Sequence, residues 1–181
     1  AMKIGVFVGS IRRSGLGMEV GQWVMDVLAD DPGIEPGIIS LRDYQVPLLD
    51  VDYMPAEQKG RYPDGEVQRF AEAIAGFDAY IFVTPEYNKG VPGPMKNAVD
   101  HLMVEWVGKP VGFVGYGGQG ARVAVSAWRP TVRNFKMRDV EPAVELNIFG
   151  EDFAGDKLTP RTEKAEDLKG MVAKIVECSK L

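Results

Sequence analysis

Cysteine and histidine are almost absent from this chain, which has one of each, Cys178 and His101. A single cysteine cannot form an internal disulfide bond, so we expect a reducing, cytoplasmic environment. One histidine without a cluster of cysteines cannot supply a multi-histidine metal site, so we expect no bound metal.

Three other features are missing. Positive charge is not in excess, because the formal net charge is −5, so we expect neither nucleic acid nor an anionic membrane as a partner. No apolar run is long enough to span a bilayer, so we expect no membrane insertion. The first residues lack the pattern of a secretory signal peptide.

What the chain does have is an ordinary globular composition over 181 residues, with 45% hydrophobic and 26% charged residues. Strand patterns alternate with helical patterns, and no shift in composition marks a domain boundary. We therefore predict a single domain over residues 1–181.

The most informative stretch runs from Tyr80 to Asp100. Its first residues are β-branched and aromatic, typical of a strand buried on both faces, and Pro85 then stops regular structure. After a loop rich in proline and glycine, apolar residues recur along one helical face: Met95, Ala98, Val99, Leu102, Met103 and Trp106. In an open α/β sheet, a loop at the carboxyl end of a strand is where ligands bind. A connection stiffened only by proline and glycine is the alternative.

A loop of similar position follows the strand predicted for Ile4–Val8, and it leads into a helix whose apolar face includes Val20 and Val24. The loop holds Gly9, Ser10, Arg12, Leu16 and Gly17. Free N–H groups at a helix start, a hydroxyl and a guanidinium are donors that bind phosphate. An ordinary connection with surface arginines remains the alternative, because the loop matches neither the dinucleotide nor the ATP-type fingerprint.

A third loop, Tyr116-Gly-Gly-Gln-Gly120, ends the strand predicted for 109–115. Its glycines remove side-chain bulk next to a flat ligand, although a flexible turn is the alternative. The helix predicted for 121–135 contains Pro130, which we expect to kink or break it. Its arginines and Trp128 predict either a solvated face or an oligomer interface.

The remaining segments complete an alternating α/β pattern. We predict an edge strand over 34–41, a short helix from Val67 to Gly76, a half-exposed edge strand over 143–149 and a terminal helix through 168–176. The long loop 51–65 is expected to border the active site. Five strands with short connections to helices predict a doubly wound parallel sheet, order 2-1-3-4-5, with helices on both faces.

The sequence T-P-E-Y-N at 84–88, followed by P-G-x-x-K-N-A-x-D, resembles the signature of the NADPH-dependent FMN reductase family, and Gly9-Ser-x-Arg12 resembles that family's phosphate loop. The resemblance covers nearly the whole chain and implies a flavodoxin-like fold and a non-covalently bound FMN. The implied FMN-binding residues are Gly9, Ser10, Arg12, Leu16, Gly17, Pro85, Glu86, Tyr87, Asn88, Tyr116, Gly117, Gly118 and Gln119. Ser14 and Ala121 depart from the pattern, since relatives often carry a longer or basic residue and a glycine there.

The implied activity is that of an NAD(P)H-dependent FMN-containing oxidoreductase. Hydride transfer through FMN N5 would reduce a quinone, azo, metal-oxyanion or flavin acceptor by a ping-pong scheme, with no catalytic side chain required. We expect the backbone of Pro85–Asn88 to position the flavin ring, rather than Glu86 or Tyr87 to act as a general acid. The resemblance also implies a homodimer or homotetramer. A flavodoxin-like one-electron carrier and a non-enzymatic FMN-binding protein are the alternatives, and the sequence leaves open the choice between NADPH and NADH.

Overall fold

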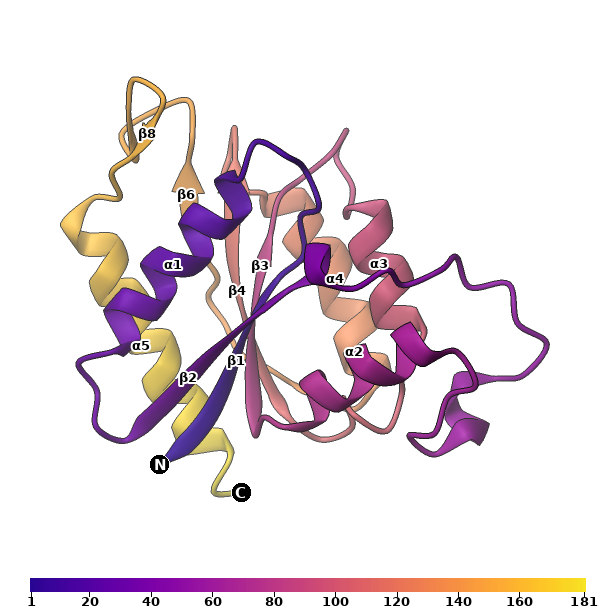
Figure 1. Ribbon diagram of the computed structural model, residues 1–181. Coiled ribbons are helices and arrows are strands. Elements are labelled where there is room, and N and C mark those ends of the chain that lie inside the picture. Colours follow the sequence, from indigo (N-terminus) through magenta and orange to yellow (C-terminus); the bar gives the residue numbers. More distant parts are fainter.

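The computed structural model describes residues 1–181 and has one parallel sheet covered by helices on both sides (Figure 1). The strands are β1 (Met2–Val8), β2 (Ile34–Ser40), β3 (Ala79–Thr84), β4 (Pro110–Gly117), β5 (Arg138–Asp139) and β6 (Val144–Asn147). The helices are α1 (Leu16–Leu28), α2 (Gly65–Ala75), α3 (Gly93–Asp100), α4 (Arg122–Asn134) and α5 (Thr162–Cys178). The strand order β2-β1-β3-β4-β5 confirms the predicted flavodoxin-like arrangement, with β2 at an edge.

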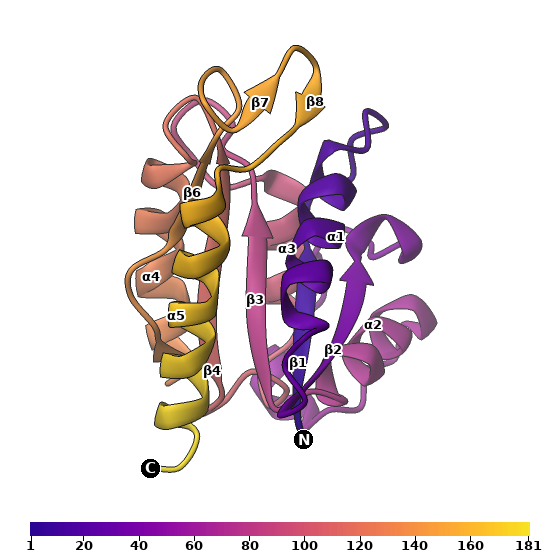
Figure 2. The ribbon, with the colours of Figure 1, turned by 90° about the vertical axis from the view of Figure 1, so that its left-hand side faces the viewer.

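Alternation along the strands sorts apolar side chains between the two faces of the sheet. In β1, Ile4, Val6 and Val8 belong to the cluster under α1 and α5, whereas Phe7 belongs to the cluster under α2, α3 and α4. Figure 2 shows α1 and α5 on the near side of the sheet and the other three helices behind it. Because both faces are covered, the strands are almost continuously apolar, as parallel strands usually are.

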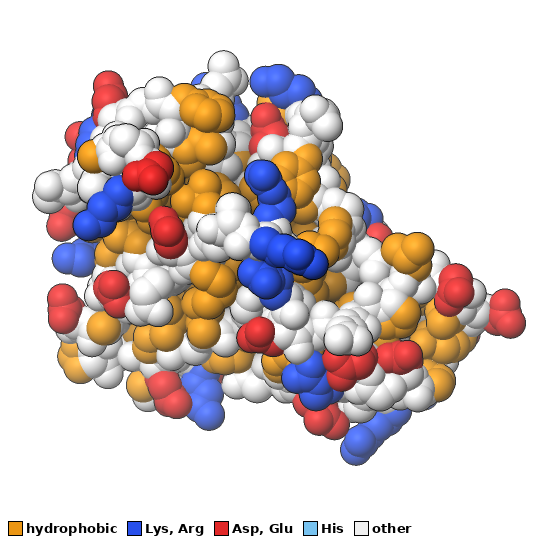
Figure 3. All heavy atoms as spheres, turned by 45° about the horizontal axis from the view of Figure 1, so that its top comes forward, with side chains coloured by type: hydrophobic (Ala, Val, Ile, Leu, Met, Phe, Trp, Pro, Cys, Tyr) orange, Lys and Arg blue, Asp and Glu red, His pale blue; other side chains and the backbone are white.

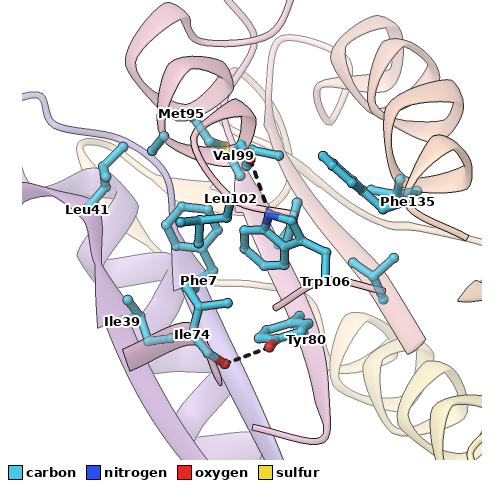
Figure 4. Close-up of a cluster of buried hydrophobic side chains, with 14 of the residues drawn as sticks. Phe7, Ile39, Leu41, Ile74, Tyr80, Met95, Val99, Leu102, Trp106 and Phe135 are labelled. Atoms are coloured by element: carbon cyan, nitrogen blue, oxygen red, sulfur yellow. Dashed lines mark hydrogen bonds between the residues drawn. The ribbon is translucent and has the colours of Figure 1, made fainter. Parts of the chain in front are cut away.

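Aromatic rings dominate the cluster between the sheet and α2, α3 and α4 (Figure 4). Trp106 is fully buried, and its ring lies 5.1 Å from that of Tyr80 and 5.5 Å from that of Phe82, centroid to centroid. Both polar aromatic groups have partners, because the Trp106 indole donates to the Val99 carbonyl and the Tyr80 hydroxyl to the Ile74 carbonyl. The core therefore buries large rings without leaving their donors unpaired.

The helix predicted from Met95 through Trp106 is shorter in the structure, since α3 ends at Asp100. The Val99 carbonyl accepts from the Leu102 N–H and from the Trp106 indole, and the Met103 N–H instead donates to the Glu105 carboxylate. Side chains thus replace the backbone partners of the next helical turn. Trp106 still reaches the core, which is why its spacing suggested a longer helix.

The predicted last strand over 143–149 is correct in place but incomplete. Two short strands, β5 and β6, lie along the same edge of β4, and Pro142, which has no N–H to donate, lies between them. After β6 the chain forms an antiparallel hairpin, β7 (Phe153–Ala154) with β8 (Lys157–Leu158), which the sequence pattern did not indicate.

Three further expectations need correction. α4 runs without a break through Pro130. Trp128 is fully buried, and its indole donates to the Thr84 hydroxyl at 3.2 Å, so it forms neither a solvated face nor an oligomer interface. The loop 51–65, which includes the short 3-10 helix η2 (Pro55–Gln58), contacts the segment after α3 through a Tyr62–Glu105 hydrogen bond of 2.8 Å. It contributes no residue to the crevice described below.

None of the helices combines the length and the apolarity that crossing a bilayer requires.

Candidate active site

Three loops meet above the carboxyl ends of β1, β3 and β4 and enclose a cavity of about 220 Å³. We call this cavity and its open mouth the crevice. Ten of the predicted site residues line it: Ser10, Arg12, Leu16, Gly17, Pro85, Glu86, Tyr87, Tyr116, Gly117 and Gly118. Three others, Ser14, Ile148 and Phe149, line it as well. The topology therefore brings together the three loops that the sequence singled out.

The first loop presents donors at the start of α1. The Ser10 hydroxyl accepts the Arg12 N–H at 3.2 Å, which folds the loop back on itself. Gly15 has φ +77°, in the left-handed region, and α1 then begins without a side-chain cap. The N–H groups of the first helical turn are thus available to an anion, and Arg12 lies exposed beside them.

Lysine and arginine side chains gather near the middle of this face of the molecule, between two hydrophobic areas (Figure 3). Arg12, Arg13 and Arg42 are all exposed, and the Arg42 guanidinium donates to the Arg12 carbonyl at 3.5 Å. A net negative protein thus carries a local positive field at its first loop, which favours an anionic group there.

Gly17 allows α1 to approach the third loop closely. A Cβ atom at this position would lie 2.8 Å from the Tyr116 hydroxyl and 3.0 Å from the Ser10 Cβ. Tyr116 is itself buried, and this burial raises the pKa of its phenol, so the hydroxyl stays protonated at neutral pH. Tyr116 is therefore a neutral hydrogen-bonding group at the base of the crevice.

The second loop is a tight two-residue turn. Tyr87 and Gly90 exchange both backbone hydrogen bonds, at 3.1 and 3.0 Å, and Asn88 and Lys89 between them have φ of 52° and 63°. Both central residues are left-handed, as in a type I′ turn. Backbone strain of this kind concentrates at functional sites. The turn places the Tyr87 hydroxyl 3.5 Å from that of Ser10.

Glu86 has a structural partner. One carboxylate oxygen accepts the Ala124 N–H in the first turn of α4 at 2.9 Å, and the other lies 3.9 Å from the Lys89 ammonium. A carboxylate at a helix N-terminus is stabilised by the helix dipole. This contact ties the second loop to α4 and gives Glu86 a role other than proton donation.

The glycines of the third loop fall into two groups. A Cβ at Gly115 would lie 2.2 Å from the Gly120 carbonyl oxygen, and one at Gly120 would lie 2.4 Å from the Glu145 Cβ, so packing requires both glycines. Packing requires neither Gly117 nor Gly118, where an added Cβ has no neighbour closer than 3.4 Å. Their missing side chains leave a flat, open backbone along the crevice.

Three predicted residues do not line the cavity. Gly9 is explained by packing, because a Cβ there would lie 2.0 Å from the sulfur atom of Met95. Asn88 occupies the tight turn, and Gln119 is exposed just beyond the cavity. A role in binding for these three stays a prediction.

The second half of the motif, P-G-x-x-K-N-A-x-D, fixes a neighbouring segment. Asn97 donates to the Pro47 carbonyl at 2.8 Å and accepts the Leu49 N–H at 2.9 Å, and the His101 ring nitrogen Nε2 lies 2.8 Å from the same Pro47 carbonyl. These residues hold the chain after β2 against α3. The motif thus combines a ligand-facing loop with a clamp, and only the first lies at the crevice.

Ile148 and Phe149 were missed as site residues because they follow the last strand of the sheet. They were assigned to the end of a predicted strand. They directly follow β6, and β6 pairs with β4, whose end carries the third loop. This pairing is the feature that could have placed them at the crevice.

A larger cavity of about 550 Å³ lies between α4, β6 and α5. Its charged groups already pair with one another, as Arg122 does with Glu145 at 2.8 Å and Arg129 with Glu141 at 3.4 Å. The remaining charged group, the Lys174 ammonium, donates to the Glu141 carbonyl at 3.0 Å, so the polar groups of this cavity already have partners and the crevice is the better candidate despite its smaller volume. No group of three or more His, Cys, Asp or Glu side chains is arranged to hold a metal ion.

The chain is similar to known proteins along nearly its whole length. The family model described as NADPH-dependent FMN reductase matches residues 2–150. The NAD(P)H-dependent FMN reductase ntnL of a Nectria species is 35% identical, over 98% of this chain and 97% of that protein. An NAD(P)H-dependent FMN reductase of Schizosaccharomyces pombe is 30% identical, over 99% and 90% of the two chains. A quinone reductase of Pseudomonas putida is 32% identical over 67% of this chain and 66% of that protein.

Among solved structures, the flavoenzyme NAD(P)H:(acceptor) oxidoreductase FerB of Paracoccus denitrificans superposes with a TM-score of 0.75 at 23% identity, covering 99% of this chain and 98% of that one. An apo NADH:FMN oxidoreductase, EMOB, gives a TM-score of 0.71 at 17% identity, covering 97% and 88%. At these identities the two likenesses show a shared fold.

Proposed function

The chain belongs to the NADPH-dependent FMN reductase family, and from this premise we propose that the crevice holds one FMN and that a small flat acceptor is reduced beside it. The protein is an NAD(P)H-dependent oxidoreductase with FMN as its cofactor. The observation that carries the proposed site is the meeting of a donor-rich loop and an open glycine loop in one cavity.

The residues of the crevice fit this cofactor. At one end, Ser10, Arg12 and the uncapped start of α1 would hold the phosphate. At the other, the bare backbone of Gly117 and Gly118 would face the flat ring, with the Phe149 ring next to Gly118. Between them, the backbone of the Pro85–Asn88 turn would position the ring, held rigid by the Glu86 contact to α4.

When bound, FMN supplies the redox chemistry by taking a hydride from the nicotinamide and returning two electrons to the acceptor. With a quinone, the hydride and one proton from solvent give a hydroquinone, and NADPH leaves as NADP⁺. The chain itself would bind and orient the cofactor and the substrates, and it would exclude water from them. Glu86 is occupied at α4 and Tyr116 stays protonated, so neither needs to exchange a proton during turnover.

We expect ping-pong kinetics, because the chain offers one crevice of this kind to both the hydride donor and the acceptor. Double-reciprocal plots with NADPH and 1,4-naphthoquinone as varied substrates should give parallel lines, and NADPH alone, without oxygen, should bleach the flavin absorption. Intersecting lines together with a trapped ternary complex would contradict a shared site. Bound FMN without NAD(P)H oxidation would favour an electron carrier or a non-enzymatic FMN-binding protein.

We also propose that the chain forms a homodimer or homotetramer. Trp106 and Trp128 are fully buried and give no support to an interface. Exposed apolar side chains on two neighbouring segments do support one. Residues with exposed apolar side chains on these segments are Leu48, Leu49, Val51, Met54, Val104 and Val107. A patch of this kind favours association. Light scattering at assay concentrations should give two or four times the chain mass of 19.9 kDa, and the mass of one chain would refute the proposal.

We further propose that residues 1–181 act as a single FMN-binding domain and that the protein works in the cytoplasm. The single cysteine, Cys178, supports a reducing compartment, because the chain has no second thiol with which to form an internal disulfide.

A further inference from the structure

Phe149 is unusual because it lines the crevice and yet is 84% exposed. Most of the large apolar side chains of this chain are buried, and every other phenylalanine ring is buried or half-buried. When a ligand covers apolar surface at the wall of its site, that surface is removed from water, and this favours binding. The position of this ring therefore calls for a functional explanation.

The ring lies along the open part of the third loop. A Cβ added to Gly118 would lie 3.4 and 3.5 Å from two ring atoms of Phe149, an ordinary van der Waals separation. The ring and the bare backbone of Gly118 thus form one continuous wall, which Ile148 extends. Tyr87, from the second loop, lines the same cavity.

The segment that carries Phe149 is anchored. Asp152 is fully buried, and its carboxylate accepts the Asn147 N–H at 2.9 Å and the Arg161 N–H at 3.0 Å. The Phe149 N–H donates to the Asn147 side chain at 3.1 Å. Hydrogen bonds on both sides of the residue hold its backbone next to the crevice.

The cavity is small, so a bound ligand would extend toward the exposed Phe149 ring. Its volume of about 220 Å³ is smaller than the range of about 300–1,000 Å³ usual for small-molecule sites, so a cofactor and a second substrate together must extend into the mouth. Phe149 is the exposed aromatic side chain among the lining residues. Flat aromatic molecules gain from stacking on such a ring in addition to burying area.

We propose that Phe149 forms one wall of the slot for the electron acceptor and favours flat aromatic acceptors over compact inorganic ones. This inference rests on the proposed function, since it assigns a specificity-determining residue to the same site. The donors for the FMN phosphate come from the first loop, so Phe149 takes no part in the phosphate contacts.

The test compares Phe149→Leu, which keeps apolar bulk without a ring, with Phe149→Tyr, which keeps the ring. Each purified variant is assayed at saturating NADPH with 1,4-naphthoquinone and with ferricyanide, and its FMN content is measured. In Phe149→Leu the KM for naphthoquinone should rise roughly three- to tenfold, with kcat nearly unchanged. Ferricyanide kinetics should change much less than naphthoquinone kinetics, the FMN content separates an effect on the acceptor from one on the cofactor, and Phe149→Tyr should keep the low KM.

Several outcomes would overturn the inference alone: an unchanged KM in Phe149→Leu, equal losses with both acceptors, or a loss of FMN in step with activity. A change in the number of chains per assembly would instead assign the ring to a subunit interface. Absence of bound FMN or of NADPH oxidation in the unmodified protein would overturn the proposed function and this inference together.

Discussion

Arg12→Ala should weaken FMN binding roughly tenfold to hundredfold and leave riboflavin binding nearly unchanged. The Arg12 guanidinium lies at the crevice beside the uncapped start of α1, where a phosphate would bind. A hydrogen bond to a charged group contributes about 1.5–3 kcal/mol, which converts to that range of affinity. Riboflavin lacks the phosphate, so it has no such bond to lose.

Arg13→Ala is the matched control for this prediction. Arg13 is the next residue and is equally exposed, but it does not line the crevice. Removing it changes the net charge by the same amount, so any general electrostatic effect appears in both variants. Fluorescence titration of the apoprotein with each flavin measures the affinities. Equal losses for FMN and riboflavin in Arg12→Ala would place Arg12 away from the phosphate.

The centre of the sheet was predictable from the sequence because β1, β3 and β4 are short apolar runs, each followed by glycine or proline. β1 and β3 are buried along nearly their whole length, and such runs have no other stable place than the middle of a parallel sheet. Once the order of strands is known, the meeting of the loops after β1, β3 and β4 follows from topology.

Elements governed by side-chain hydrogen bonds were not predictable. α3 ends early because Glu105 and Trp106 take over backbone partners, and hydrophobic spacing carries no information about such exchanges. The roles of individual glycines were hidden for a similar reason. Gly9 and Gly118 look alike in the sequence, but the first accommodates Met95 and the second faces the open crevice.

The segment after β6 was the largest omission. Its anchor is Asp152, one acidic residue among several in a polar stretch, and nothing in the pattern marks it as buried. Only the fold shows that its carboxylate accepts backbone N–H groups from both ends of the segment. Charged residues are rarely buried unless they are paired, so sequence reasoning assigns them to the surface by default.

Asp152→Asn should lower the free energy of unfolding at pH 7 by about 2–4 kcal/mol, because two charge-assisted hydrogen bonds weaken and the amide NH₂ faces an N–H donor. Urea unfolding measures the loss. Asp156→Asn is the control, since Asp156 is exposed in the turn between β7 and β8. A loss of equal size in both variants would deny Asp152 its role as an anchor.

The pH dependence of this difference is fixed in sign. Burial alone would raise the pKa of Asp152, but the N–H groups of Asn147 and Arg161 and the Arg161 guanidinium outweigh it and lower the pKa below its usual value. A carboxylate with a lowered folded pKa stabilises the protein above its unfolded pKa of about 3.9 and loses that contribution as the pH falls through the folded value. The difference between wild type and Asp152→Asn should therefore shrink below about pH 4.

The KM for a quinone should also depend on the hydrogen bonds of Asp152. With its segment loosened, Phe149 no longer has a fixed place, so Asp152→Asn should raise the KM for 1,4-naphthoquinone as Phe149→Leu does, at a temperature where the variant is still folded. FMN affinity should stay high, because Arg12 and α1 lie on a separate loop. Combining Asp152→Asn with Phe149→Leu should add little to either alone, as expected for two residues that act through one ring. Fully additive increases would show that Asp152 and Phe149 act independently.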